Sequence, residues 1–161
     1  MTTAIAWYRS PIGVLQIEGS AEAIHRVAFV DGEVDGCRGT EALPAAVEAC
    51  LTQLDEYFRG KRFSFSLPLH AAGTPFQTTV WSRLADVPYG STSTYRQISV
   101  SLARDAAVRA VGTAVGQNRW AVIIPCHRII GSDGKLRGYA WGLWRKEWLL
   151  QHETEQVRTK K

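Results

Sequence analysis

The sequence is poor in cysteine and has no long apolar run. Its 161 residues include three cysteines, an odd and low number that excludes a scaffold held together by disulfides. It indicates a reducing compartment, so we expect a cytoplasmic protein. The longest apolar run covers residues 120–124, far short of the roughly 18 residues that cross a bilayer. Residues 1–9 lack the basic head and apolar core of a signal peptide, so we expect none, and no membrane association.

Neither sign of charge is abundant in the chain as a whole. Hydrophobic residues make up 45% and charged residues 21%, a balance that is typical of a folded globular protein and excludes disordered, collagen-like and coiled-coil chains. The charges are unevenly distributed, since residues 1–75 hold six Lys or Arg and nine Asp or Glu, whereas residues 76–161 hold thirteen and six. A basic half favours a nucleic-acid partner, because neutralised phosphates release counterions. Charge alone does not distinguish a nucleic-acid-binding surface from a basic surface that is merely solvated.

The first half of the chain has the pattern of a small sheet and a helix. Three β-rich runs separated by turn residues predict a meander, over residues 5–8, 14–18 and 24–30. Residues 43–58 place apolar side chains at three- and four-residue steps, which predicts an amphipathic helix. Residues 63–69 are predicted to form another strand. A domain boundary near residue 72 divides the chain into domains 1–72 and 73–161.

The second half is predicted to be mainly helical. Thr74 and Gln77 form a capping box around a proline at the first helical position. Thr94 repeats the cap and opens a short helix that reaches residue 102. A further helix is predicted over residues 105–116. Two short helices joined by a tight turn, within the basic half, indicate a helix-turn-helix.

The second helix of this pair contains two glycines, each costing about 1 kcal/mol relative to alanine. Gly112 and Gly116 share a face, as do Ala110 and Ala114. Two interpretations stay open at this point: close packing against another helix, or a low-profile helix that enters a narrow groove. The minor groove of DNA is about 6 Å wide. In the second interpretation Arg109 is the long side chain that reaches the base stack.

The apolar run 120–124 predicts a buried strand. A cysteine and a histidine, Cys126 and His127, stand at the end of this strand. A thiol with an ordinary pKa of about 8.5 is mostly protonated at neutral pH, and a histidine that accepts its proton activates it. Neighbours in an extended chain point in opposite directions, so we expect a bridging water. A buried structural cysteine is the alternative that this pair alone leaves open.

The residues around this cysteine resemble the O6-alkylguanine-DNA alkyltransferase family. The core is Pro125-Cys126-His127-Arg128, preceded by Asn118 and followed by Gly138-Tyr139, Gly142-Leu143, Lys146, Leu149-Leu150 and Glu153. Upstream, the match includes Phe76-Gln77, Val80-Trp81, Val87-Pro88-Tyr89-Gly90, Thr94-Tyr95 and Arg109-Ala110-Val111-Gly112. The resemblance covers nearly all of residues 75–153, and the turn Ser10-Pro11-Ile12-Gly13 resembles the family's opening.

The resemblance implies an α/β (α+β) fold, with a small N-terminal ribonuclease H-like α/β domain and a mainly helical winged-helix-like domain that contains the helix-turn-helix. It implies a DNA repair enzyme that flips O6-alkylguanine, and secondarily O4-alkylthymine, out of double-stranded DNA. The alkyl group passes irreversibly to Cys126, so each molecule acts once. No metal or cofactor is required, because a thiolate attacks carbon unaided. We expect a monomer, and cooperative binding to DNA stays open.

The resemblance also implies roles for individual residues. His127 takes the thiol proton through a water, Glu153 orients His127, and Asn118 braces the turn that carries Cys126. Tyr95 rotates the 3′ phosphate and donates to the lesion base. Arg109 occupies the gap left by the flipped nucleotide. The other residues assigned to substrate or DNA binding are Ala110, Gly112, Arg128, Ile129, Tyr139, Ala140 and Trp141, with main-chain groups at Cys126, Ile129 and Ala140 lining the base pocket.

Three positions depart from the pattern of many family members. Arg119 follows the bracing asparagine where proline is common, and we expect it to add a phosphate contact. Ala140 stands where some members have serine, but a main-chain donor survives there. Trp141 stands where some members have glycine, and we expect it to narrow the pocket. None of these changes removes a catalytic group.

Two other functions remain open from the sequence. A non-catalytic protein that binds alkylated DNA is one, although such relatives lack the cysteine. A cysteine hydrolase that uses Cys126, His127 and Glu153 is the other, and it leaves the basic half unexplained. We expect no metal site, because the scattered ligand types lack short spacing; they are His25, His70, His152, Cys37 and Cys50. Cys50 is predicted to be core and Cys37 an exposed thiol.

Overall fold

The computed structural model describes residues 3–31, 42–70, 72–104 and 107–159. The chain forms two compact units, Met1–Ala71 with Arg119–Ile123, and Ala72–Asn118 with Ile124–Lys161. The first unit therefore takes in a short segment from far along the chain, which the sequence analysis does not foresee. The limits 1–72 and 73–161 for the folding domains stay a prediction.

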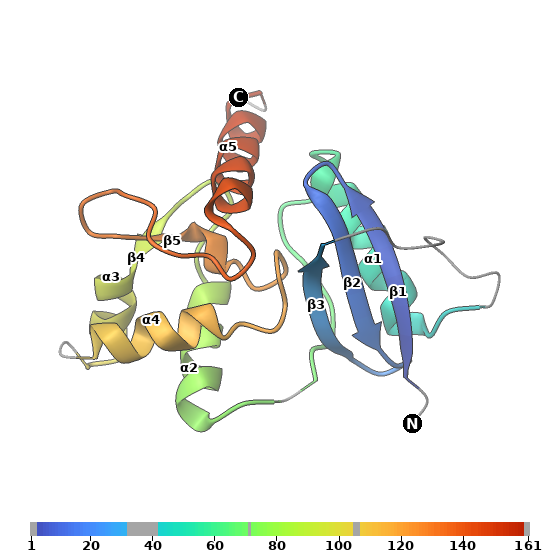
Figure 1. Ribbon diagram of the computed structural model, residues 1–161, viewed down its shortest axis with the longest axis horizontal. Helices are drawn as coiled ribbons and strands as arrows, with labels where there is room; N and C mark the ends of the chain where they lie inside the picture. The colour runs from blue at the N-terminus through green and yellow to red at the C-terminus, as the bar shows by residue number, and fades with distance from the viewer. Residues whose placement is uncertain (1–2, 32–41, 71, 105–106, 160–161) are drawn as a thin grey trace. The chain divides into compact units, whose positions relative to one another are not determined.

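The first unit is a three-stranded antiparallel sheet with a helix packed against it (Figure 1). Its elements are β1 (Ala4–Ser10), β2 (Gly13–Gly19), β3 (Ile24–Val30) and α1 (Ala45–Phe58). Alternate side chains of β2 point into the core, and Leu15 and Ile17 are fully buried, as are Val47 and Leu54 of α1. The predicted meander and amphipathic helix are confirmed.

The strand predicted over residues 63–69 is wrong. Only Leu69 in this stretch forms a bridge, a parallel one to Ile24 of β3. The Gln53 side chain donates to the carbonyl of Ser66 (3.1 Å) and accepts from its N–H (2.9 Å). Because a side-chain amide satisfies these backbone groups, the segment needs no neighbouring strand.

The strand predicted over residues 120–124 is wrong as well. Trp120 forms a parallel bridge to Val27 of β3, but the chain turns soon afterwards. Val122 has a φ of 69°, a left-handed conformation that is rare for a β-branched residue. The run is apolar because it is buried, with Ala121 at 0% exposure, and burial without alternation does not distinguish a strand from a turn.

The second unit is mainly helical and contains a two-stranded parallel sheet, β4 (Ser93–Thr94) with β5 (Ile129–Ile130). Its helices are α2 (Pro75–Ala85), α3 (Tyr95–Ser101), α4 (Val108–Gly116) and α5 (Leu143–Thr159). Both predicted capping boxes are present, because Thr74 pairs with Gln77 and Thr94 with Gln97. None of the helices in the described ranges is long and apolar enough to cross a membrane.

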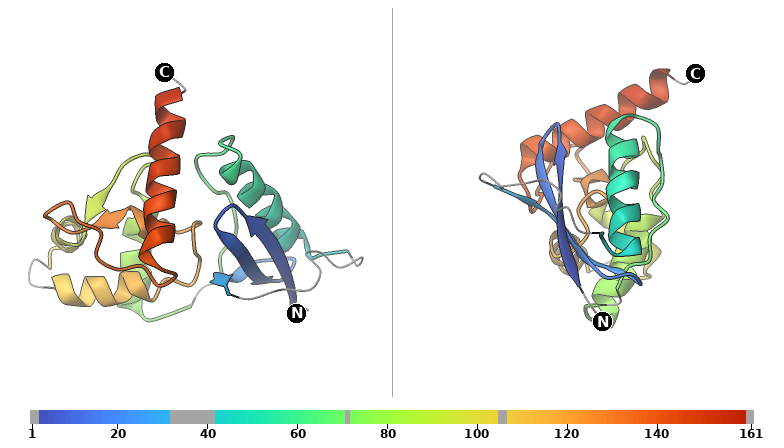
Figure 2. Two further views of the ribbon diagram at one scale, coloured as in Figure 1. Left: turned by 45° about the horizontal axis from the view of Figure 1, so that its top comes forward. Right: turned by 90° about the vertical axis from the view of Figure 1, so that its right-hand side faces the viewer.

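Helices α3 and α4 form the predicted helix-turn-helix and pack against α2 (Figures 1 and 2). Helix α4 begins at Val108, later than predicted, and residues 105–106 of the prediction lie outside the described residues. The indole N–H of Trp81 donates to the carbonyl of Ala114 at 2.9 Å, so a small residue at 114 allows α2 to approach α4. The α/β fold class, with a small sheet domain before a helical one, is confirmed.

Candidate active site

Cys126 begins a short 3₁₀ helix, η1 (Cys126–Arg128), directly before β5. This helix replaces the extended chain that the sequence analysis expects there. Cys126 is 3% exposed. The amide nitrogen of Asn118 donates to the Cys126 sulfur at 3.2 Å and to the Ile124 carbonyl at 2.9 Å. Asn118 therefore ties the end of α4 to the turn that carries the cysteine, in the position predicted for a brace.

Glu153 of α5 is the centre of a buried network behind the cysteine. One carboxylate oxygen accepts from His127 Nε2 at 2.7 Å and from Arg128 Nη2 at 3.0 Å. The other accepts from Arg128 Nε at 2.8 Å and from the Gly90 N–H at 3.3 Å. Arg128 also donates to the Val87 carbonyl at 2.7 Å. His127 and Glu153 are 0% and 1% exposed, so this network is shielded from bulk solvent.

The charges in this network fix the tautomer of His127. Burial acts to raise the pKa of Glu153, but His127 and Arg128 outweigh it and hold the pKa well below its usual range. Burial lowers the pKa of His127 despite the nearby carboxylate. A neutral imidazole beside an ionised carboxylate must donate through Nε2, because the carboxylate can only accept. Nδ1 then carries the lone pair, and it is buried with no hydrogen-bond partner in the described part of the chain.

Burial raises the pKa of the Cys126 thiol to about 11, and two neighbours, the Asn118 hydrogen bond and the charge of Lys146, act against this increase. Lys146 of α5 is fully buried, and its ammonium donates to the Gly138 carbonyl at 2.9 Å. Burial lowers the pKa of Lys146 to about 8. No role for Lys146 follows from the sequence pattern. The signal that could have indicated its burial is its place on α5 three residues from both Leu143 and Leu149, of which Leu149 is fully buried.

The thiol opens into a small pocket of about 110 Å³, lined by Tyr95, Gly112, Val115, Gly116, Cys126, Gly138, Tyr139 and Ala140. Pockets for drug-sized ligands measure roughly 300–1,000 Å³, so this one suits a single flat ring system. A methyl group added at Gly112 would lie 3.8 Å from the Tyr95 ring, and one at Gly116 would meet nothing within 4 Å. The two glycines therefore leave the pocket face of α4 without protruding side chains. Close packing against another helix does not require them.

Several other residues that the sequence assigns to substrate or DNA binding lie outside the pocket lining. Arg128 is buried in the Glu153 network, and Ile129 is fully buried in β5. Trp141 packs edge-on against Tyr139 with ring centroids 5.2 Å apart. Arg109 and Ala110 are exposed on α4. The structure thus gathers Tyr95, Gly112, Tyr139 and Ala140 around Cys126, and it does not bring Arg128, Ile129 or Trp141 into the pocket lining.

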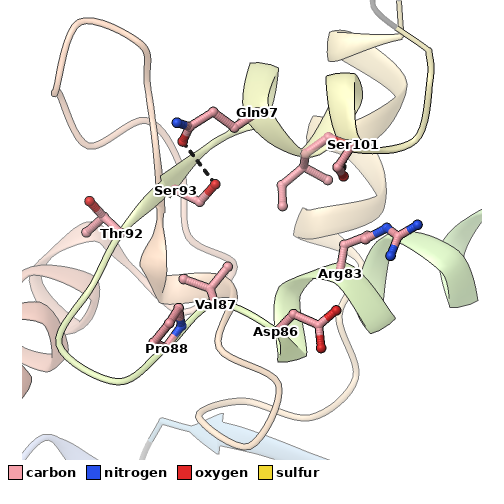
Figure 3. A pocket seen from close by; sticks show the side chains of 9 residues that line it. Arg83, Asp86, Val87, Pro88, Thr92, Ser93, Gln97 and Ser101 are labelled. Atoms are coloured by element: carbon pink, nitrogen blue, oxygen red, sulfur yellow. Dashed lines mark hydrogen bonds between the residues drawn. The ribbon is translucent and has the colours of Figure 1, made fainter.

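A larger depression of about 520 Å³ lies between the end of α2, β4 and α3 (Figure 3). It is lined by Arg83, Asp86, Val87, Pro88, Thr92, Ser93, Gln97, Ile98 and Ser101. The hydroxyl of Ser93 donates to the Gln97 side-chain oxygen at 3.1 Å. This lining holds no cysteine or histidine, whereas Cys126 lines the smaller pocket.

No group of three His, Cys, Asp or Glu side chains in the described ranges could hold a metal ion. His25 stacks on His70 with ring centroids 4.2 Å apart, and His152 stacks on Trp148. Cys50 is buried in the core, as predicted. Cys37, predicted to be an exposed thiol, lies outside the described residues.

Two family models match this chain. Residues 5–71 match the ribonuclease-like domain of 6-O-methylguanine DNA methyltransferase, and residues 75–155 match its DNA-binding domain. The Methanosarcina barkeri methylated-DNA–protein-cysteine methyltransferase is 43% identical over 155 residues, which cover 92% of this chain and 96% of that protein. The Mycobacterium leprae protein of the same name is 40% identical over 151 residues, covering 93% and 92%.

Solved structures agree with these matches. The crystal structure of Mycobacterium tuberculosis O6-methylguanine methyltransferase superposes with a TM-score of 0.83 at 36% identity, covering 96% of this chain and 94% of that one. The M. tuberculosis protein in complex with DNA superposes equally well, with the same score and identity over 94% and 93% of the two chains. The chain described here, with its DNA-binding domain and buried Cys126, belongs to the methylated-DNA–protein-cysteine methyltransferase family.

Proposed function

We propose that the protein removes the alkyl group from O6-alkylguanine in double-stranded DNA, and secondarily from O4-alkylthymine, by transferring it to Cys126. The observation that carries this proposal is a buried thiol in a ring-sized pocket, next to a histidine whose basic nitrogen has no protein partner among the described residues. The sulfur attacks the alkyl carbon, the carbon–oxygen bond breaks, and a thioether remains. The carbon–sulfur bond of a thioether is inert at neutral pH, so the thiolate is not regenerated and each molecule acts once.

The proton leaves the thiol through His127. One water bridges the Cys126 sulfhydryl and Nδ1, and the proton moves onto Nδ1 as the sulfur becomes a thiolate. The resulting imidazolium forms an ion pair with Glu153, whose oxygen is already 2.7 Å from Nε2. Arg128 holds that carboxylate through two nitrogens. Arg128 therefore positions Glu153 and does not make the DNA contact that the sequence predicts.

Tyr95 supplies the proton that the departing guanine needs. Breaking the bond to O6 leaves negative charge on the base, and protonation of a ring nitrogen removes it. Burial, and then the charge of Cys126, raise the pKa of Tyr95, so the phenol is protonated and able to donate at neutral pH. Its position in the lining of the same pocket as Cys126 brings the donor to the base.

The partner is DNA, which must present the base outside the helix. A base in a duplex hides its O6, and turning it out costs a few kcal/mol. Helix α4 has Gly112 and Gly116 on its pocket face, and Arg109 stands one turn before them at the three- and seven-residue steps that share a face. We infer that α4 enters the minor groove and that Arg109 fills the vacated space. We further infer a cytoplasmic monomer.

A cysteine hydrolase is the second candidate, because Cys126, His127 and Glu153 also suit acyl transfer. The pocket disfavours it. Hydrolysis needs donors aimed at an oxyanion, whereas the nearby Asn118 amide is directed at the sulfur itself and at the Ile124 carbonyl.

The intact mass of the protein tests the proposed function. After incubation with duplex DNA that contains O6-methylguanine, the mass is expected to rise by one methylene equivalent, once per molecule. DNA with unmodified guanine is the control and should leave the mass unchanged. An unchanged mass with methylated DNA contradicts the proposal. Binding without transfer would then support a non-catalytic protein, and turnover of an ester or amide would support a hydrolase.

Arg109→Ala is expected to slow repair of duplex DNA by about tenfold or more, because an arginine that fills the gap offsets part of the few kcal/mol of unstacking. Transfer from a free O6-alkylguanine base needs no flipping and is expected to fall far less. Single-turnover rates with the two substrates measure this difference. Arg96→Ala, which removes an exposed charge from α3, is the matched control. Equal losses with duplex and free base would assign Arg109 to the fold or the thiol.

A further inference from the structure

The loop between β5 and α5 carries an ion pair that the proposed chemistry does not use. Residues 131–138, the 131–138 loop, extend from β5 and are drawn in orange in Figure 1. The Arg137 guanidinium donates to the Asp133 carboxylate. Their side chains are 56% and 42% exposed. An exposed ion pair contributes little to stability, so another anion can displace this carboxylate at little cost.

The backbone of the loop is built to bring these two side chains together. Gly131 donates to the Lys135 carbonyl and Gly134 to the Gly131 carbonyl, each at 2.9 Å. A methyl group at Gly131 would lie 2.7 Å from the Asp133 carboxylate and 2.9 Å from Arg137 Nε. A side chain at position 131 would push these two side chains aside, so the glycine leaves room for both to fold back over the turn.

The loop also ends at the pocket. Gly138 lines the pocket together with Tyr95 and Cys126, and its carbonyl is held by the buried Lys146 ammonium. Arg137, the preceding residue, therefore lies beside the pocket mouth, and its charge is near enough to act on the Tyr95 phenol, whose pKa it lowers against the larger effect of burial. A pocket of about 110 Å³ holds the base alone, so the phosphates of the same nucleotide stay outside, within reach of residues at the pocket edge.

We propose that Arg137 binds a backbone phosphate of the strand that delivers the flipped nucleotide, and that Asp133 holds the guanidinium ready until the phosphate replaces the carboxylate. The proposal rests on the proposed function. A guanidinium matches phosphate with two parallel N–H donors. Asp133 has a second effect. When Arg137 is absent, the Asp133 carboxylate is unpaired and repels the phosphates of the incoming strand.

Binding of duplex DNA containing O6-methylguanine, measured by fluorescence anisotropy over a range of salt concentrations, tests this proposal. Arg137→Ala is expected to weaken binding about tenfold and to reduce the slope of log affinity against log salt by about one, as for one lost phosphate contact. Asp133→Asn is expected to strengthen binding a few fold. The double variant should bind more tightly than Arg137→Ala alone, because it removes the unpaired carboxylate.

Arg59→Ala is the matched control, because Arg59 and Asp55 form the same type of exposed pair, four residues apart, in the first unit. It should leave affinity and salt slope unchanged. Arg137→Lys should keep the slope and lose part of the affinity, and thermal unfolding establishes that each variant is folded. An Arg137→Ala variant with the affinity and slope of Arg59→Ala overturns the proposal, as does Asp133→Asn binding as weakly as Arg137→Ala. Wild-type protein that gains no methyl group in the mass measurement would instead overturn the proposed function.

Discussion

Cys126→Ser is expected to abolish alkyl transfer while duplex DNA still binds with nearly the wild-type affinity. The hydroxyl fits the space of the thiol, and Asn118 can donate to oxygen as it does to sulfur at 3.2 Å. A serine hydroxyl, however, is a weak nucleophile at its free pKa and lacks the intrinsic reactivity of sulfur. Because Cys126 is one small group in the pocket, its loss removes the chemistry and little of the interface.

Intact mass and fluorescence anisotropy together measure the two effects. Cys50→Ala is the matched control, because Cys50 is also a buried free thiol, placed in α1 of the first unit. Burial raises the pKa of the Cys50 thiol to about 12. Asn118 and Lys146 oppose the same effect at Cys126, which also lines the pocket, so removal of Cys50 should leave transfer intact. Peptide mapping of the methylated wild-type protein should place the methyl group on Cys126. Removal of methyl groups by Cys126→Ser, or a label on another cysteine, would refute the assignment.

Local signals in the sequence predict much of the fold correctly. Each capping box depends on a threonine and a glutamine three residues apart, so Thr74 and Thr94 mark the starts of α2 and α3 without knowledge of the rest of the chain. The apolar stripe of α1 is equally local. Residues 120–124 are different, because their conformation depends on a bridge to Val27, far away along the chain. The apolar composition of these residues predicts that they are buried, but it does not predict that the chain turns there.

The candidate site divides in the same way. Cys126 and His127 are adjacent, and their pattern is visible in the sequence. The network that fixes the His127 tautomer joins Arg128 to Glu153 across 25 residues. From the sequence alone, an arginine that follows a cysteine and a histidine in a basic half is more easily interpreted as a DNA contact. Lys146 is missed for a related reason, since a lysine is usually exposed and its burial against Gly138 arises only from the packing of α5.

Glu153→Gln is expected to destabilise the protein by about 3–5 kcal/mol, the usual result of removing one partner from a buried ion pair. The replacement is isosteric, but its amide has one acceptor oxygen and one donor nitrogen. The carboxylate accepts from His127 and Arg128 on one oxygen and from Arg128 and Gly90 on the other. Whichever way the glutamine amide turns, its NH₂ group faces N–H donors, and the Arg128 charge is left unpaired in the interior.

The same variant is expected to slow alkyl transfer by about 10²–10⁴-fold, the range that a positioned general base contributes. A neutral amide no longer requires His127 to donate through Nε2, so the proton can reside on Nδ1, which then cannot accept the thiol proton. Nitrogen chemical shifts of the His127 ring report which nitrogen carries hydrogen, and chemical denaturation reports the stability. Glu155→Gln, an exposed change on the same helix, should alter neither the His127 tautomer nor the stability. A Glu153→Gln protein with wild-type stability, rate and tautomer would show that the carboxylate neither supports the fold nor orients the base.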